Sequence, residues 1–248
     1  MVVHDSGERF PLSSVAAARV AVPGQGDDRR PTAYARAVPR EAGGAWLQYW
    51  LFYPAQDQDR GVVRTGRHAG DWELIQLRVD AGGRPKEVVY AQHSGAERCR
   101  WSVVERRGGH PVVYAARGSH ASYLRAGVRD RMWPDPNDEA GGGGRVVRPR
   151  IVRVSAGSPA WMGWPGHWGG ARARWWMPAE QSSPRGPAFQ PDGRWSDPEA
   201  WADTARDCQA HCNQVDECDG GEKALGAGGA ATLVGAAVLG WRRRRRRG

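Results

Sequence analysis

Residues 46–53 form an almost unbroken run of aromatic and aliphatic side chains, which Pro54 follows directly. Eight residues, seven of them apolar, match the length of a strand, and a run without alternation is typical of a strand that is covered on both faces. A proline directly after the run favours the end of the strand at that point. The run therefore predicts a central strand in a sheet that has other parts of the protein packed on both faces.

More strand-like runs follow at short intervals, and the Gly- and Pro-containing stretch 81–85 predicts the turn of a hairpin. A further strand is expected at 100–106, and the alternation at 145–155 is typical of an edge strand. No long helical pattern precedes residue 224, and 34 Gly and 17 Pro residues favour turns over helices. We therefore expect an all-β fold, a single antiparallel β-sandwich whose core comes from the runs 46–53, 72–79, 87–93 and 111–116.

Tryptophan is unusually frequent, with 13 residues against three Phe, and more than half of it lies between residues 161 and 201. Gly and Pro are also common in this stretch, and no periodicity is visible. We expect an irregular segment whose rings cover one face of the sheet. The alternative is an aromatic surface that contacts a sugar or a lipid.

Two carboxylates lie in the second predicted strand. Side chains two residues apart share a face of a strand, so Asp71 and Glu73 should project together while Trp72 and Leu74 pack on the other face. His68 precedes them by one short loop. Like charges this close repel unless a cation lies between them, and a His, Asp and Glu set suits a divalent ion with mostly oxygen ligands. The sequence predicts a calcium, magnesium or manganese site here; the alternative is a capping aspartate, an exposed glutamate and a surface histidine.

Other polar side chains are expected near the same site. The preceding loop carries Asp57 and Asp59, which are further metal-ligand candidates. His93 and His120 follow predicted strands, and both are candidates for the same pocket as ligands, general acid or base groups, or supporting residues. Ser119 stands next to His120, but no partner aspartate or oxyanion hole is evident for a nucleophilic pair.

Two charged features carry less information. The loop 130–144 contains Asp135, Asn137, Asp138 and Glu139 without EF-hand spacing, so we interpret it as a solvated loop. The net charge of +9 includes six arginines at 242–247, which leaves +3 for the rest of the chain. That remainder is ordinary for a protein surface, so we expect no nucleic-acid partner.

The C-terminal tail predicts a membrane anchor. Residues 224–241 are 18 residues without charge, and six arginines follow at once. Such a stretch is just long enough to cross a bilayer, and the arginines favour the cytoplasmic side, which places the domain on the extracytoplasmic side. No signal peptide is visible at Met1, so we expect the true start to lie upstream of it. The alternative is a disordered Gly/Ala tail with a basic end.

The four cysteines fit an exported protein. Cys208, Cys212 and Cys218 cluster after the Trp-rich segment, and Cys99 is separate. Their spacing matches no zinc signature. Two disulfides, or one disulfide and free thiols, are both compatible with it, and the sequence alone leaves the connectivity open.

Several motifs together resemble one family, and the resemblance covers roughly residues 5 to 201. In chain order they are the segments 49–54, 68–73, 92–94, 118–123, 166–169 and 183–187, and their joint order is far more specific than any one of them. They resemble the vacuolar protein sorting-associated protein 62 family. The His/Asp-Trp-Glu segment of that family is in turn similar to the necrosis- and ethylene-inducing peptide-like cytolysins, β-sandwiches that hold a divalent cation and bind sphingolipid head groups.

This resemblance implies metal ligands at His68, Asp71 and Glu73. A further upstream aspartate of the cytolysins has its nearest counterparts at Asp57 and Asp59. The cytolysins carry a second histidine where this chain has a glycine just before Asp71, and this departure speaks against toxin activity.

We therefore expect three regions: a β-sandwich domain at 1–204, a Cys-containing spacer at 205–223, and a membrane-spanning or sorting tail at 224–248. The predicted function is a surface-anchored sandwich that holds a divalent cation and binds a polar lipid head group or a glycan. One alternative is a metal-dependent hydrolase of phosphoester or glycosidic bonds, with His93 or His120 as general acid. The other is a non-catalytic sorting adaptor.

Overall fold

The computed structural model describes residues 2–4, 31–57, 67–131, 137–141, 146–169 and 183–208. The ligand candidate Asp59, the cysteines Cys212 and Cys218, and the predicted tail at 224–248 lie outside the described residues. In the part of the chain that is described, no helix is long and apolar enough to cross a membrane.

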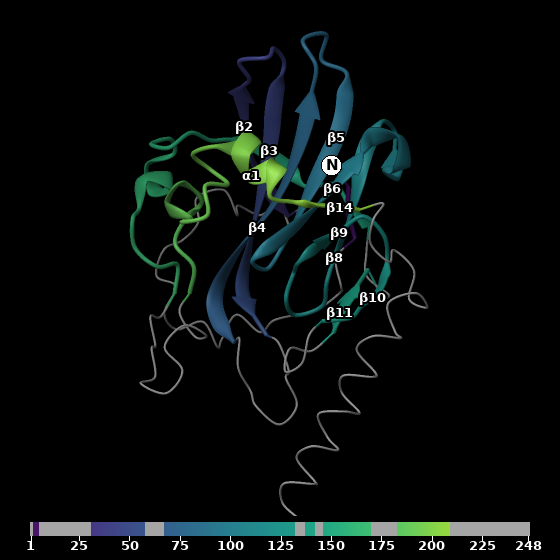
Figure 1. Ribbon diagram of the computed structural model, residues 1–248. Helices are drawn as coiled ribbons and strands as arrows, with labels where there is room; N and C mark the ends of the chain where they lie inside the picture. The colour runs from purple at the N-terminus through teal and green to yellow at the C-terminus, as the bar shows by residue number, and fades with distance from the viewer. Residues whose placement is uncertain are drawn as a thin grey trace, which may run out of the picture.

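The largest sheet of the described fold has seven strands in the order β13–β2–β3–β4–β5–β6–β14 (Figure 1). Strands β2 to β6 follow one another along the chain and pair antiparallel, whereas the edge strands β13 and β14 pair parallel to their neighbours. These strands are β2 Thr32–Pro39, β3 Ala45–Gln56, β4 His68–Val79, β5 Pro85–Gln92, β6 Gly95–Arg100, β13 Arg150–Arg153 and β14 Arg206–Asp207.

Smaller elements complete the described fold. One further sheet contains β1 Val2–His4, β7 Arg106–Arg107, β8 His110–Ala115, β9 Ser122–Tyr123 and β12 Val146–Val147, and a hairpin-like pair contains β10 Gly127–Arg129 and β11 Asp138–Ala140. A short helix, α1 Pro198–Asp203, lies over the large sheet (Figure 1). Short 3-10 turns lie at Trp101–Val103, Ala160–Gly163 and Pro187–Phe189.

The fold is mostly β, as predicted, and the four core runs all form strands. It differs from the predicted single antiparallel sandwich because the large sheet is mixed and the other strands form small sheets. Both parallel edge strands come from late in the chain, where local pattern gives no sign of their partners. The predicted strand at 100–106 is also wrong in part: Trp101 and Val103 alternate towards the core, but they do so from a 3-10 turn. Strand β3 also continues past Pro54, whose position the ladder with β4 skips.

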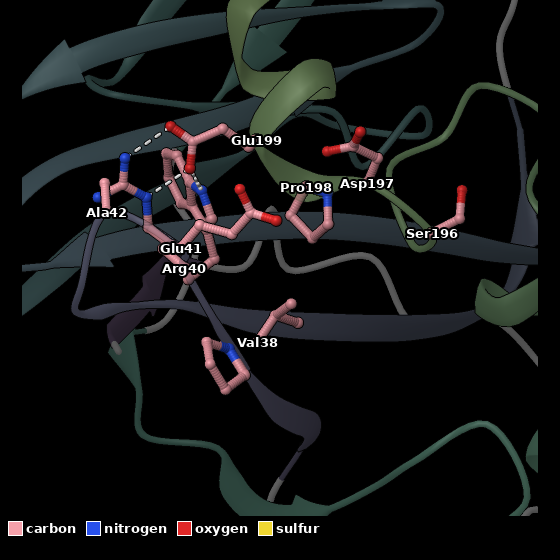
Figure 2. A pocket seen from close by; sticks show the side chains of 10 residues that line it. Val38, Arg40, Glu41, Ala42, Ser196, Asp197, Pro198 and Glu199 are labelled. Carbon is pink, nitrogen blue, oxygen red and sulfur yellow. Dashed lines mark hydrogen bonds and ion pairs between the residues drawn. The ribbon is translucent and has the colours of Figure 1, made fainter.

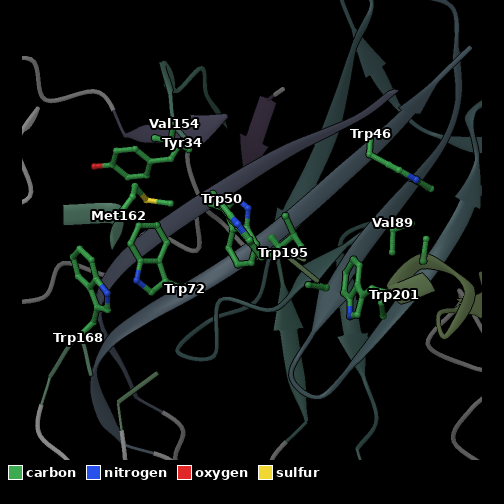
Figure 3. Packing of buried hydrophobic residues seen from close by; sticks show 14 residues of the cluster. Tyr34, Trp46, Trp50, Trp72, Val89, Val154, Met162, Trp168, Trp195 and Trp201 are labelled. Carbon is green, nitrogen blue, oxygen red and sulfur yellow. The ribbon is translucent and has the colours of Figure 1, made fainter. Parts of the chain in front are cut away.

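One face of the large sheet carries a tryptophan-rich core. Rings from β2, β3 and β4 lie along the strands, and Trp168, Trp195 and Trp201 from the irregular segment pack onto them (Figure 3). The pairs meet mostly edge to face or tilted, as for Trp72 and Trp168 with ring centroids 5.2 Å apart. The prediction that this segment covers a sheet face is confirmed for its described residues, among which Trp164 is exposed at 52%, whereas Trp175 and Trp176 lie outside the described residues.

Two buried glutamines fix the irregular segment to the sheet. Gln48 on β3 donates to Gln76 on β4 over 2.8 Å and to the backbone carbonyl of Arg194, while Gln76 donates to the carbonyl of Pro198 over 2.9 Å. Arg36 donates to Gln48 over 2.7 Å and lies 3.7 Å from the ring centre of Trp195, and its burial lowers its pKa to about 10. An irregular backbone has no ladder partners of its own, so these side chains supply hydrogen bonds that a strand would supply in a sheet.

The opposite face of the large sheet packs against β8. Ile75 and Leu77 of β4 share a buried cluster with Val113 and Ala115 of β8. A disulfide between Cys99 on β6 and Cys208 extends this cluster and closes the described fold, with the two Cα atoms 5.3 Å apart. This bond resolves the part of the cysteine connectivity that the described residues contain.

Candidate functional site

The two predicted carboxylates lie side by side at the buried start of β4. Asp71 is 5% exposed and Glu73 6%, and both lie on the face of β4 that also carries Ile75. Trp72 and Leu74 belong to the tryptophan-rich core on the other face, so the predicted division of the strand into two faces is confirmed. The Asp71 and Glu73 carboxyl groups are therefore held inside the protein on a rigid element.

The glycine before Asp71 is required by close packing. Gly70 has φ +67°, and a Cβ at this position would lie 2.2 Å from the carbonyl oxygen of Trp168. Gly169, in the Trp168 segment, is equally close to β4, because a Cβ added at Gly169 would lie 2.4 Å from the carbonyl oxygen of Ala69. A histidine, which the cytolysins carry at the position of Gly70, is excluded here by the backbone of the Trp168 segment.

The two late motifs of the resemblance meet in this segment. His167 forms an isolated antiparallel bridge with Arg185, and its Nδ1–H donates to the carbonyl of Ser183. The backbone N–H of Trp168 donates to the carbonyl of Pro184 over 2.9 Å. These contacts explain why segments 166–169 and 183–187 occur together: they form one unit that closes over the start of β4.

His120 is fixed against Asp71. Its Nδ1 lies 2.9 Å from Asp71 Oδ2, and its ring stacks on Tyr53 with centroids 3.9 Å apart and planes 6° from parallel. We assign the proton to Nδ1, which then donates to the Asp71 carboxylate. His120 is 3% exposed and has φ +58°, a left-handed conformation that residues with side chains rarely adopt. Asp71, Tyr53 and the backbone conformation of His120 together hold the imidazole in one orientation.

A second aspartate–histidine pair lies beside the first. His93 Nε2 and Asp138 Oδ2 are 2.7 Å apart, and the hydroxyls of Ser119 and Tyr123 each donate to Asp138 over 2.6 Å. Burial by itself would raise the pKa of Asp138, but the hydrogen bond and charge of His93, with the two hydroxyl donors, outweigh it and lower that pKa. Asp138 thus remains an ionised acceptor at the centre of three side chains.

Asp138 is the residue that sequence reasoning missed. The loop containing it was predicted to be solvated, but Asp138 is 2% exposed and begins strand β11. The error has a simple cause, because a three-residue strand is too short to show alternation. Its first and third residues are buried and its second is exposed, but the sequence Asp138–Glu139–Ala140 places a charged residue at the first buried position and so hides this alternation.

Glu73 is the least compensated group of the site. Burial raises the pKa of its carboxyl well above the usual range, the charge of Asp71 raises it further, Asp138 adds to this, and Arg194 opposes it in part. No hydrogen bond to the Glu73 carboxyl contributes among the residues that the structure describes. Burial and the neighbouring carboxyl groups therefore favour the neutral form of this carboxyl group.

The other predicted ligands lie apart. His68 Nδ1 is 2.9 Å from the carbonyl of Gly70, and the Asp57 carboxylate is 2.9 Å from Arg67 Nη2 at the surface. The Asp57 backbone N–H does reach the loop of His120, donating to Gly118 over 2.9 Å. Among the described residues, no group of three or more His, Cys, Asp or Glu side chains is placed to hold a metal ion. The set His68, Asp71, Glu73 with Asp57 and Asp59 stays a prediction, and the structure brings together Asp71, Glu73 and His120.

A pocket of about 520 Å³ lies elsewhere, between the β2–β3 turn and the start of α1 (Figure 2). Glu199 lines it, and its carboxylate accepts from Arg40 Nη2 and from the indole N–H of Trp46, each over 2.7 Å. The hydrogen bond from Arg40 is the main reason that the pKa of Glu199 falls to about 2. None of the predicted site residues lines this pocket. The ion pair between Arg40 and Glu199 fixes α1 to the turn that follows β2.

Comparison with known proteins agrees with the motifs. Residues 25–131 match the family model described as vacuolar protein sorting-associated protein 62. Among curated proteins, the chain is 26% identical over 201 residues to TDA6 of Saccharomyces cerevisiae, whose name describes it provisionally as a vacuolar protein sorting-associated protein. That match covers 60% of this chain and 43% of the yeast protein, so the chain spans less than half of that relative's length.

Two solved structures also match, each across 50% of the chain. They are described as "Toxin fold as basis for microbial attack and plant defense" and "Toxin fold for microbial attack and plant defense". Both share 15% identity with this chain and cover 50% of it, with 50% and 51% of their own chains matched and TM-scores of 0.34 and 0.33. The resemblance predicted from the ordered motifs is thus also found by the family model, over residues 25–131, and by the yeast relative.

Proposed function

We propose that this protein is a binding module that holds a divalent cation at Asp71 and Glu73 and uses this site to recognise a polar lipid head group or a glycan. The observation that carries the proposal is the state of Glu73. Its carboxyl is buried beside a second carboxyl and receives no hydrogen bond from the described residues. Buried carboxyl groups are normally paired or bound to metal, because an unpaired one is costly.

A cation fits the chemistry of these two side chains. Calcium, magnesium and manganese prefer oxygen ligands, and a positive ion beside Glu73 would reverse the effects that raise its pKa. Two carboxylates fill only part of the coordination of such an ion, so oxygen atoms of a bound head group or sugar have positions to occupy. When bound, the ion would supply a positive centre that links the protein carboxylates to ligand oxygens.

The histidines supply the polar surroundings of this site. Asp71 and Tyr53 fix the orientation and the protonated nitrogen of His120. His93 is the more accessible of the two, with 21% of its side chain exposed, and Asp138 orients it. We assign His93 to contact with the ligand and His120 to the support of Asp71.

We further propose that the tail at 224–248 anchors the module in a membrane, with the domain on the extracytoplasmic side. The disulfide between Cys99 and Cys208 supports this proposal, because such bonds persist in oxidising compartments. Polar lipid head groups and glycans are the ligands that a module in this position meets.

Isothermal titration of the full-length protein with calcium, magnesium and manganese chloride tests the cation site. We expect saturable binding of one ion and at least a roughly tenfold loss of affinity in Glu73→Gln, because an anionic oxygen ligand is lost. Glu139→Gln is the matched control, since Glu139 is an exposed carboxylate 3.7 Å from Arg117. Absence of binding in the wild type, or equal binding in Glu73→Gln, would remove the proposal.

A second candidate function is favoured by the two aspartate–histidine pairs. An aspartate that holds an imidazole in one orientation is also typical of general acid or base catalysis, so a metal-dependent hydrolase of phosphoester or glycosidic bonds is the alternative. Chromogenic phosphate esters and glycosides separate the two functions. Turnover that His120→Ala abolishes while the metal ion stays bound would establish the hydrolase in place of the binding module.

A further inference from the structure

We propose that Asp138 is a positioning residue: through Ser119 it holds the loop 117–121 that presents His120 to Asp71. The inference rests on the proposed function for what the site binds. The positioning role of Asp138 is argued from contacts among the described residues. Asp138 touches neither Asp71 nor His120 in any hydrogen bond that the structure shows. It acts through the neighbour of His120.

The loop itself is tight and holds His120 in a rare backbone conformation. The backbone N–H of Ala116 donates to Ala121 over 2.9 Å, and that of His120 donates back to Ala116 over 3.0 Å. His120 has φ +58° in this turn. A residue with a side chain keeps such a conformation only where its surroundings hold it there. Some contact outside the turn must therefore resist its relaxation.

Besides Asp71 and Tyr53 on the imidazole, Ser119 provides such a contact through the neighbouring residue. Ser119 and His120 are adjacent, yet their side chains diverge: the serine hydroxyl donates to Asp138 over 2.6 Å, and the imidazole pairs with Asp71 over 2.9 Å. The serine is 1% exposed, so no water competes for its hydroxyl. With the two side chains fixed on opposite sides, the peptide between them cannot rotate without breaking one of the two bonds.

Asp138 can act as a fixed point because strand β11 is tied to the end of β8. Ala116 and Ala140 form an antiparallel bridge, and the backbone N–H of Arg117 donates to Glu139 over 2.8 Å. His93, from the turn between β5 and β6, adds a bond to the same carboxylate over 2.7 Å. The aspartate thus joins the loop of His120 to two neighbouring parts of the fold.

Tyr123 offers a matched control within the same cluster. Its hydroxyl donates to Asp138 over 2.6 Å, the same distance as Ser119, and the residue is 4% exposed. It lies on β9, outside the turn of His120. Ser119→Ala and Tyr123→Phe therefore each remove one buried hydroxyl donor from the same carboxylate, but only the first removes the link to His120.

The experiment follows the Nδ1–H proton of His120 by 15N NMR in the full-length protein. Its exchange with water reports how often the pair with Asp71 opens, and this readout needs no bound cation. Since hydrogen bonds to charged groups are among the stronger ones, we expect Ser119→Ala to speed exchange roughly tenfold or to lose the signal. Tyr123→Phe should leave the exchange rate within about twofold of the wild type, even if its melting temperature falls as much as that of Ser119→Ala.

Two results would overturn the proposal. If both variants keep a slowly exchanging Nδ1–H, then the bond from Ser119 to Asp138 is not needed to hold His120. If both lose it together with a similar loss of melting temperature, then Asp138 only contributes to general stability. Calcium titration of the same variants separates this inference from the proposed function. A wild type that binds no cation sinks the proposed function, whereas the proton readout still decides the role of Asp138.

Discussion

Replacement of Gly70 by alanine should be far more damaging than its small size suggests. A Cβ at Gly70 would lie 2.2 Å from the Trp168 carbonyl oxygen and 3.0 Å from the carbonyl carbon, so the tryptophan backbone must move. The residue also has φ +67°, which costs a non-glycine residue about 1–2 kcal/mol. The substitution therefore combines a backbone penalty with displacement of a core tryptophan.

The size of the second contribution follows from burial. Trp168 is 7% exposed and packs against Phe52, Trp72 and Trp161. A tryptophan side chain buries roughly 200 Å², worth about 5 kcal/mol at 25 cal/mol per Å², and a displacement that loses half of this costs about 2.5 kcal/mol. With the backbone penalty, we expect Gly70→Ala to lower the free energy of unfolding by about 3–5 kcal/mol, near the upper end for one substitution.

Gly83 provides the control for the backbone penalty alone. It has φ +74° in the turn between β4 and β5, but nothing lies within 4 Å of the Cβ that alanine would add. Gly83→Ala should therefore cost about 1–2 kcal/mol at most. Urea unfolding of both variants, followed by circular dichroism, measures the difference. Equal losses of stability in the two variants would show that the Trp168 segment does not press on β4, and the reasoning about this contact would be wrong.

Acid should weaken the link between α1 and the sheet: the pKa of Glu199 falls to about 2 from an ordinary 4.5, so its stabilisation is complete above pH 4.5 and is lost as pH falls towards 2. Unfolding free energies measured from pH 6 to pH 2 should fall less steeply in Glu199→Gln, and parallel curves would contradict this. Reduction of the Cys99–Cys208 disulfide, which closes 109 residues, should cost about 2–5 kcal/mol in urea unfolding, and Cys99→Ala should abolish the effect of reductant; a wild type insensitive to reductant would refute it. Finally, the full-length chain should sediment with membranes while a chain truncated before Ala224 should not, and a soluble full-length protein would exclude the anchor.

The local pattern of the sequence was sufficient for the parts of the fold that repeat locally. Strands β3 and β4 are long enough for their residue patterns to be visible in the sequence. The aromatic run and the two faces of β4 were therefore both predicted correctly. Asp71 and Glu73 entered the site for the same reason. Helix α1 was missed although Asp197 caps it and Pro198 begins it, because a six-residue helix has no visible periodicity.

The rest of the site depends on contacts between residues far apart in the chain. Asp138 reaches His93 across 45 residues, and His120 reaches Asp71 across 49. Nothing in the neighbourhood of either aspartate indicates its partner, since such pairs are set by the packing of β8 and β11 against the large sheet. The requirement for Gly70 is equally invisible in the sequence, because it comes from the backbone of Trp168.

The disulfide at Cys208 also determines how the domain would carry mechanical load. Strand β14 has two residues, and on its own it would peel from β6 when the chain beyond residue 208 is pulled, releasing α1 and Trp201 from the sheet next. The covalent bond to Cys99 transfers such a force directly into β6, which is held by the ladder with β5. A pull on the C-terminal side therefore acts on the large sheet and bypasses the weakly paired segment.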